Sequence, residues 1–303
     1  MRHGTSRPEF LLGGGQGHPG SELRAVRSHP RRACGDRRGL RVLITSGAIG
    51  SVSPGLVSAT LASAFRQAGA SVAVVDLAPS HPTPRDLGQL AEVLGRGEAI
   101  IDLRGCTFQP SAARAARRVL ERSDWTAIVA DGESELELTG LKGAAVRNSR
   151  TLGEGLAGGL AADAAAVNWL AENGLADGPG AGAVNGLGAL LIAAGVRLAE
   201  SLPYEIAASG FRRGAGEADL VVVGTNELDF HLRGGPLVAR VVEVATEFLV
   251  PVIVVAERCF ISARELRLAG IEAAYPVFHS SGGVADVADL AELARRVARS
   301  WRF

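Results

Sequence analysis

The stretch of sequence that decides the fold runs from residue 177 to residue 256. It reads DGPGAGAVNGLGALLIAAGVRL at 177–198, ADLVVVGTNELDFHLRGGP at 218–236 and VPVIVVA at 250–256. A glycine-rich loop leads into an apolar helix, and two short apolar runs follow, each bounded by turn residues. Short runs that are almost continuously apolar are typical of buried strands in parallel sheets. The succession predicts an α/β fold.

The same alternation extends over the chain from Arg41 onward. Short apolar runs alternate with amphipathic stretches, as in βαβ units that build a Rossmann-like, mostly parallel sheet with helices on both faces. We predict strands at 41–46, 71–77, 99–103, 126–130, 219–224, 250–256 and 273–277. We predict helices at 54–67, 84–94, 110–122, 151–172, 187–198, 235–248, 262–268 and 284–299.

The three quoted segments carry a resemblance to a known family. The type I glycerate kinases have PGAGAAGGxGAxLxAFLGAxL, then DLVITGEGRLDxQTxxGKxP, then a PVIxxAG strand, in this order and at nearly this spacing. In that family a Rossmann-like domain is built from both chain ends, and a second domain is inserted between them. The resemblance implies a Rossmann-like kinase domain at 40–131 and 178–303. It also implies an inserted segment at 132–177, which is reduced because the family's GGSATNDGG motif has no counterpart.

Composition places the chain among globular proteins. Of its 303 residues 47% are hydrophobic, which is enough to bury a sizeable core. No apolar run approaches the roughly 18 to 20 residues that span a bilayer, and the N-terminus lacks the apolar region of a signal peptide. We therefore expect a cytoplasmic protein with no membrane partner. The cysteines show no metal-ligand or disulfide spacing, and we expect no metal site.

The first 39 residues are basic, with eight arginines against three acidic residues. Such a segment could meet nucleic acid electrostatically. It has no interleaved aromatic residues beyond Phe10 and no periodic apolar face, which favours a disordered extension. We therefore expect no nucleic-acid partner.

The glycine-rich loop is a candidate anion site. Gly180, Gly182 and Gly186 let backbone N–H groups approach an anion, and the N-terminus of the following helix adds partial positive charge. The resemblance implies that this loop holds a phosphate or a carboxylate of the substrate. A tight turn whose glycines permit close packing is the alternative.

The segment VLITSGAIGSVSPG at 42–55 matches VLIAPDSFKGSLSA of the family. Ser51 and Ser53 fall on its Gly-Ser-x-Ser, and the resemblance implies that they bind substrate or phosphate. The family's lysine is replaced by Ile49, which cannot carry charge to a phosphoryl group. Lys142 is the only lysine of the chain, so the sequence offers few cations for phosphoryl transfer.

Asp229 is the candidate catalytic residue. It follows a predicted strand at the carboxyl end, where ligands collect in open α/β sheets, and it matches the Asp of the family's GEGRLD. Its carboxylate could accept the proton of a sugar-acid hydroxyl. A helix-capping or solvated aspartate is the alternative. Arg150 is the candidate clamp, because Arg binds carboxylate or phosphate through two parallel hydrogen bonds.

By resemblance, the chain is a glycerate kinase-like protein that transfers the γ-phosphoryl group of ATP to a hydroxyl of glycerate. ATP and Mg²⁺ would then be its cofactors, and glycerate or a similar sugar acid its small-molecule substrate. The Glu, Gly and Arg of the family's GEGR are replaced by Thr225, Asn226 and Glu227, so we expect a catalytically degenerate member. A non-catalytic module that binds small anions or nucleotides on the same fold is the alternative. The oligomeric state stays open.

A second resemblance concerns the opening strand, turn and helix. RVLITSGAIG at 41–50, followed by GASVAVVDLAP at 69–79, resembles the start of NAD-dependent short-chain dehydrogenases, in which Asp76 would bind the ribose. That class also requires Tyr-x-x-x-Lys. Tyr204 and Tyr275 are the only tyrosines, and neither has a lysine at that spacing. A dehydrogenase is therefore the least favoured of the three functions.

Overall fold

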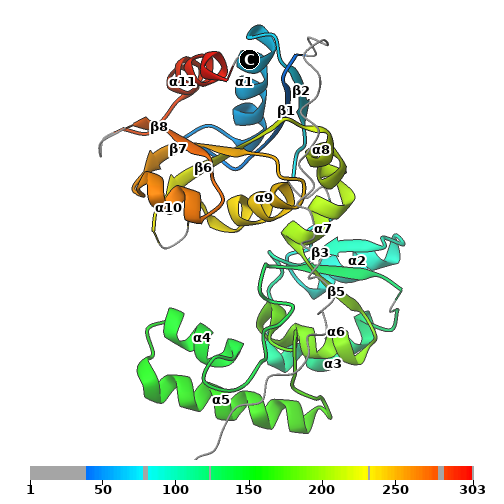
Figure 1. Ribbon diagram of the computed structural model, residues 1–303. Helices are drawn as coiled ribbons and strands as arrows, with labels where there is room; N and C mark the ends of the chain where they lie inside the picture. Colours follow the sequence, from blue (N-terminus) through cyan, green and yellow to red (C-terminus); the bar gives the residue numbers. More distant parts are fainter. Residues whose placement is uncertain (1–38, 78–80, 123, 231–232, 279–282, 302–303) are drawn as a thin grey trace, which may run out of the picture. The chain divides into compact units, whose positions relative to one another are not determined.

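The computed structural model describes residues 39–77, 81–122, 124–230, 233–278 and 283–301, which form two sheets (Figure 1). The larger sheet has the strand order β2-β1-β6-β7-β8, and the smaller has the order β3-β4-β5. All of these strand pairs are parallel. The Rossmann-like, mostly parallel α/β fold predicted from the sequence is confirmed.

The five-stranded sheet is built from both ends of the described chain. Its strands are β1 (Arg41–Ser46), β2 (Ser71–Val74), β6 (Leu220–Leu228), β7 (Val252–Cys259) and β8 (Ala273–Phe278). In the centre of the sheet β1 pairs with β6, from Val42 opposite Leu220 to Ser46 opposite Gly224. The central strands are buried along most of their length, because helices cover both faces.

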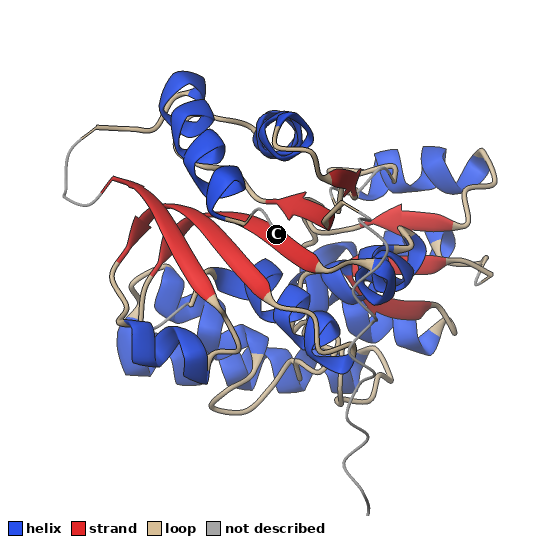
Figure 2. Cartoon of the chain, turned by 45° about the horizontal axis from the view of Figure 1, so that its top comes forward, coloured by secondary structure: helices blue, strands red, loops and turns tan. Residues whose placement is uncertain are grey.

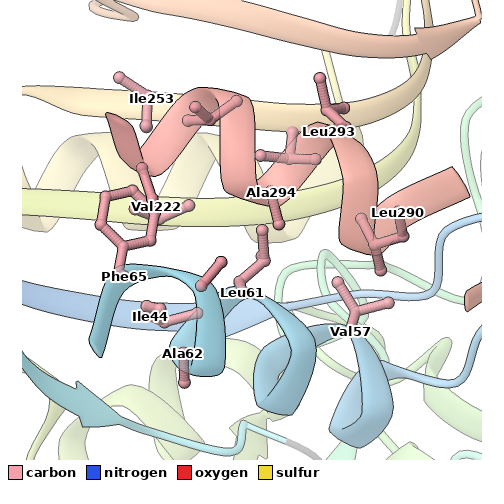
Figure 3. Close-up of a cluster of buried hydrophobic side chains, with 14 of the residues drawn as sticks. Ile44, Val57, Leu61, Ala62, Phe65, Val222, Ile253, Leu290, Leu293 and Ala294 are labelled. Atoms are coloured by element: carbon pink, nitrogen blue, oxygen red, sulfur yellow. The ribbon is translucent and has the colours of Figure 1, made fainter. Parts of the chain in front are cut away.

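Figure 2 shows helices on both faces of this sheet. One face is covered by α1 (Pro54–Gln67) and α11 (Val287–Ser300), and the other by α8 (Phe211–Glu217), α9 (Gly235–Glu247) and α10 (Ala263–Leu268). Successive strand residues point to opposite faces, so Ile44 packs in the first cluster and Leu43 in the second. Figure 3 shows the first cluster, in which Leu61 and Phe65 of α1 lie among side chains of α11 and the strands.

The smaller sheet has its own core. Its strands are β3 (Ile100–Asp102), β4 (Thr126–Val129) and β5 (Arg197–Glu200), and the helices packed with them are α2 (Leu87–Gly95), α3 (Ala113–Val119) and α6 (Leu187–Ala193). The short helices η1 (Pro110–Ala112) and η2 (Ala183–Gly186) adjoin α3 and α6, and α7 (Ser201–Ala208) follows β5. A further apolar cluster joins α4 (Ala144–Thr151) and α5 (Gly155–Glu172) to the loop around Leu138.

The structure divides the strands differently from the single sheet expected over 40–131 and 178–303. The strands at 100–102 and 126–129 form the second sheet with β5, whose first two residues, 197 and 198, were expected to end a helix. Gly195 has a φ of 80° and ends α6 early, and Val196 is buried just before β5 begins. Periodicity reveals a strand without revealing its partner, so the two sheets could not be separated in the sequence.

Two further segments were expected outside the kinase domain, and the structure describes mainly the second of them. The extension expected at 1–39 lies outside the described residues, apart from Gly39. The reduced insert expected at 132–177 contains α4 and α5. Within the described chain, no helix combines the length and the apolarity that crossing a membrane requires.

Candidate functional site

The candidate site lies at the carboxyl edge of the five-stranded sheet. After β1 the chain continues to β2 on one side, whereas after β6 it continues to β7 and β8 on the other. Because β1 and β6 are neighbours, the connections leave their carboxyl ends in opposite directions. Ligands of open parallel sheets bind at such a switch point. The loops that follow β1, β6 and β7 therefore form the candidate site.

The loop after β1 is tied to its neighbours by hydrogen bonds. The backbone N–H of Gly50 donates to Oδ1 of Asn226 at 2.8 Å, which links the loop after β1 to the carboxyl-terminal part of β6. The N–H and the hydroxyl of Ser51 both donate to the carbonyl oxygen of Ala285 at 3.0 Å. Ile49, which takes the place of the family's lysine, is fully buried. Hydrogen bonds to neighbouring segments therefore hold this loop in place.

Two helix N-termini meet this edge without a side-chain cap. Ser53 is the N-cap residue of α1 and is exposed, but its side chain makes no capping hydrogen bond. The N-cap of α9 is Gly234, with a φ of 87°, which has no side chain to cap with. The hydroxyl of Thr225 in β6 donates to the carbonyl of Gly234 at 3.0 Å and holds the start of α9 in place. Uncapped first turns carry partial positive charge and bind anions.

Glu257 is a buried acid near the carboxyl end of β7. It is only 3% exposed, and its Oε1 accepts a hydrogen bond from the N–H of Ala285 at 2.8 Å. Its Oε2 pairs with Nη1 of Arg258 at 3.2 Å, and Nη2 of Arg258 donates to the carbonyl of Gly283 at 2.7 Å. Glu257 therefore holds the loop before α11 and neutralises the arginine next to it. The signal for Glu257 in the sequence is an acid directly after the apolar run VIVVA.

Asp229 lies directly after β6, at the carboxyl end where it was expected. Its side chain is half-buried, and its carbonyl accepts a hydrogen bond from the N–H of Arg233 at 3.1 Å. The strand runs beyond its predicted end at Gly224, because residues 227 and 228 pair with Arg258 and Cys259. Arg233 has a φ of 45° and supplies a second arginine at this edge. Ser51, Ser53 and Asp229 thus belong to loops at one edge of the sheet.

The glycine-rich loop contacts a different part of the chain. A Cβ added to Gly180 would lie 2.7 Å from Cδ1 of Leu198, and one added to Gly182 would lie 2.4 Å from the carbonyl oxygen of Glu137. Gly186 has a φ of 95° and is the N-cap of α6. Other protein atoms therefore already fill the space beside Gly180 and Gly182 that a side chain would occupy. The anion-binding role of these three glycines stays a prediction.

Arg150 occupies the last turn of α4, where its side chain is exposed. The same helix is joined to the glycine-rich loop, because Nδ2 of Asn148 donates to Oδ1 of Asn185 at 2.6 Å. The structure thus connects the helix of Arg150 with the glycine-rich loop, while Asp229 belongs to the five-stranded sheet. The clamping role of Arg150 stays a prediction.

A second group of charged side chains lies at the carboxyl ends of β3, β4 and β5, and sequence reasoning missed it. Arg104 forms a two-pronged ion pair with the buried carboxylate of Asp102, at 3.0 and 2.8 Å. Glu205 of α7 is 6% exposed, and its Oε1 lies 3.5 Å from Nε2 of His81. No hydrogen bond from the described residues reaches that oxygen. Burial raises the pKa of Glu205, and the positive charges of His81 and Arg104 oppose that shift.

The tyrosines do not resemble the proton donor of a dehydrogenase. The hydroxyl of Tyr275 accepts a hydrogen bond from Nε1 of Trp301 at 2.9 Å, next to the first apolar cluster. The ring of Tyr204 packs edge-on against His81. Both side chains have structural contacts, so neither supports dehydrogenase chemistry.

Comparison with known proteins decides the family. A sequence model of the glycerate kinase family matches residues 138–302. The chain belongs to the glycerate kinase family. It is 32% identical over 253 residues to the uncharacterized proteins Mb2228c of Mycobacterium bovis (strain ATCC BAA-935 / AF2122/97) and MT2261 of Mycobacterium tuberculosis (strain CDC 1551 / Oshkosh). The match covers 80% of this chain and 61% of each relative, so the chain spans about three-fifths of their length.

A solved structure supports the fold of this glycerate kinase family member. A protein of Salmonella typhimurium LT2, provisionally named glycerate kinase 2, superposes with a TM-score of 0.64 at 18% identity, over 86% of this chain and 96% of that one. The resemblance found in the sequence is thereby confirmed at the level of family and fold. The candidate edge itself differs from the family's motifs, since Thr225, Asn226 and Glu227 in the last part of β6 replace the Glu, Gly and Arg of GEGR.

Proposed function

We propose that this glycerate kinase-like protein binds glycerate or a similar sugar acid, together with the phosphates of ATP, at the carboxyl edge of the five-stranded sheet. The observation that carries the proposal is the pair of uncapped helix N-termini at the switch point, those of α1 and α9. Each offers N–H groups and partial positive charge to an anion, and the two follow the two strands that flank the switch point.

The proposal gives the individual residues distinct roles. Asp229 accepts the proton of the hydroxyl that attacks the phosphoryl group. Ser51 and Ser53 bind the anion beside the start of α1. Gly180, Gly182, Gly186 and Arg150 form a second anion contact in the loop and helix beside the smaller sheet. That second contact has less support, because two of its glycines are already in close contact with protein atoms.

Mg²⁺ fits this edge only as a partner of the nucleotide. Among the described residues no group of three or more His, Cys, Asp or Glu side chains is arranged to hold a metal ion. Mg²⁺ in phosphotransferases is usually held by one or two carboxylates and by phosphate oxygens. Because Asp229 is assigned to the attacking hydroxyl, the ion would be held mainly by phosphate oxygens, and it would neutralise charge that develops on the transferred group.

We further propose that phosphoryl transfer is slow. The reaction depends on several positive groups around the transferred phosphoryl group. At the candidate edge Arg258 is paired with Glu257, and the buried Ile49 takes the place of the family's lysine. Among the described residues of the loop between β6 and α9, Arg233 carries the positive charge, and this charge also acts on Glu265. Binding is thereby favoured over turnover.

The test measures binding and turnover separately. Thermal shift with glycerate and with Mg-ATP should show stabilisation, of about 2.7 kcal/mol at a ligand concentration one hundred times Kd. ADP release in the presence of glycerate should exceed the rate without glycerate only slightly. Asp229→Asn should abolish that excess, because a general base contributes about 100-fold or more to the rate.

The matched control is Asp124→Asn, which changes an exposed aspartate beside Arg122 and should leave both signals unchanged. An absence of any thermal shift with sugar acids and nucleotides would refute the binding proposal. Rapid turnover that Asp229→Asn does not affect would refute the assigned chemistry.

A further inference from the structure

A cavity of about 390 Å³ lies outside the candidate edge, in the part of the chain that carries the glycine-rich loop. It is bounded by the segment that contains η1, by α4 and α5, and by η2. Its lining residues are Phe108, Gln109, Pro110, Leu138, Ala145, Asn148, Ala162, Ala165, Ala166, Trp169 and Asn185. None of them carries a charge, which favours a neutral ligand group. The volume lies within the usual range for small-molecule sites, roughly 300 to 1,000 Å³.

The walls of this cavity suit a flat ring. Trp169 and Phe108 pack edge to face with their ring centroids 6.2 Å apart. The indole Nε1 of Trp169 donates to the carbonyl of Pro110 at 3.0 Å, so the ring is held in one orientation. The alanines that α5 contributes leave a shallow apolar surface next to it. An aromatic ring that is fixed in this way can stack against a planar ligand.

The polar end of the cavity is a pair of amides. Nδ2 of Asn148 donates to Oδ1 of Asn185 at 2.6 Å. This bond uses one donor and one acceptor, so the pair still has N–H donors and a carbonyl oxygen to offer. A donor and an acceptor side by side match the edge of a heterocyclic base, as when Asn or Gln pairs with adenine.

The backbone next to Asn185 is strained at Val184. Val184 and Asn185 have φ values of 49° and 58°, in the left-handed region, and Gly186 follows with a φ of 95°. Asparagine tolerates this region, but for a β-branched valine it is an outlier. Strained residues of this kind persist only where the surrounding structure holds them, and they cluster at ligand sites. Here the strain places the amide of Asn185 at the cavity.

We propose that this cavity binds a planar heteroaromatic ring with an amide-like edge, that is, a nucleobase. The ring stacks on Trp169, and its polar edge pairs with Asn148 and Asn185. The proposal does not depend on the proposed function, because all lining residues lie between residues 108 and 185 and none belongs to the five-stranded sheet. A free base and the base of a nucleotide share this chemistry.

The experiment titrates the protein with adenine, adenosine, AMP and toluene while the tryptophan fluorescence is followed. We expect saturable quenching by the three adenine compounds and none by toluene. Trp169→Phe should remove the quenching, because Trp125 is buried elsewhere and Trp301 lies beside Tyr275. Equal affinity for adenine and AMP would identify the base alone as the ligand, whereas tighter binding of AMP would point to the base of a nucleotide.

Asn185→Gly provides the decisive variant. Glycine adopts the left-handed conformation freely, so this variant keeps its fold while it loses the amide. Its affinity for adenosine should fall at least tenfold, whereas Asn168→Gly, an exposed position of α5 that does not line the cavity, should bind as the wild type does. The proposal is overturned if no adenine compound gives saturable quenching, if toluene binds equally well, or if Asn185→Gly binds adenosine normally.

Discussion

Two glycines of the glycine-rich loop offer a direct test of what that loop does. Gly182 has helical backbone angles, φ −77° and ψ −11°, which any residue can adopt. An added Cβ would nevertheless lie 2.4 Å from the carbonyl oxygen of Glu137 and 2.9 Å from Cβ of Ala144. The first neighbour is backbone and cannot move aside without shifting the chain. Gly178, in the same loop, has no heavy atom within 4 Å of the corresponding position.

Gly182→Ala should therefore destabilise the protein by about 1–3 kcal/mol, the usual cost of overpacking a well-packed site. For a domain of this size each kcal/mol lowers Tm by about 2–4 °C. Gly178→Ala should be neutral or stabilising by up to about 1 kcal/mol, because alanine restricts the unfolded chain. Urea denaturation, with the m-value checked for constancy, measures both free energies of unfolding.

The comparison separates packing from anion binding. If the loop is a packing device, Gly182→Ala lowers the free energy of unfolding while the thermal shift that phosphate produces is unchanged. The reasoning is refuted if Gly182→Ala is as stable as Gly178→Ala. If Gly182→Ala has normal stability but phosphate no longer raises its Tm, the loop binds an anion, as predicted from the sequence.

Three further outcomes follow from buried groups. Burial raises the pKa of Glu205, so its stabilising contribution is present below the ordinary glutamate pKa of about 4.3 and is lost as the pH rises through the raised value. The Tm of Glu205→Gln should therefore equal that of the wild type near pH 4 and exceed it near pH 8. The opposite trend would contradict this argument. Glu257→Ala should cost about 1.5–3 kcal/mol in denaturant unfolding, because it removes hydrogen bonds to a charged group; a neutral effect would show that the loop before α11 is held otherwise. Burial raises the pKa of Cys106 to about 11, so this thiol should resist alkylation at pH 8 until the protein is unfolded, as followed by mass spectrometry.

The sequence predicted individual elements better than their assembly. The first strand and the first helix were predicted with the bounds that the structure has, 41–46 and 54–67, because an apolar run and a first-turn proline mark them locally. The helices α7 and α8 were not predicted, since they are only 8 and 7 residues long and Ser209 and Gly210 interrupt the pattern between them. The split into two sheets depends on which strands pair, and pairing is decided by contacts between distant residues.

The candidate site was predictable where it depends on position along the chain. Asp229 follows a strand at its carboxyl end, and this much is visible in the apolar run before it. The contacts that Glu257, Glu205 and Asn185 make could not be predicted from the sequence around them. They arise from burial, from a left-handed backbone and from partners more than 20 residues away, such as Ala285 for Glu257 and Asn148 for Asn185.

The origin of the larger sheet in both chain ends has a consequence for how the protein is made. β1 pairs with β6 across a separation of 178 residues, measured between the paired residues Val42 and Leu220. While the ribosome extends the chain, β1 and β2 can pair, but the inner edge of β1 has no neighbour until residue 220 emerges. The intervening smaller sheet, whose strands lie between residues 100 and 200, can be completed first. During synthesis one edge of the apolar strand β1 therefore stays unpaired until β6 has been made. We expect chaperones that cover such edges to prevent aggregation of this protein chiefly during that interval.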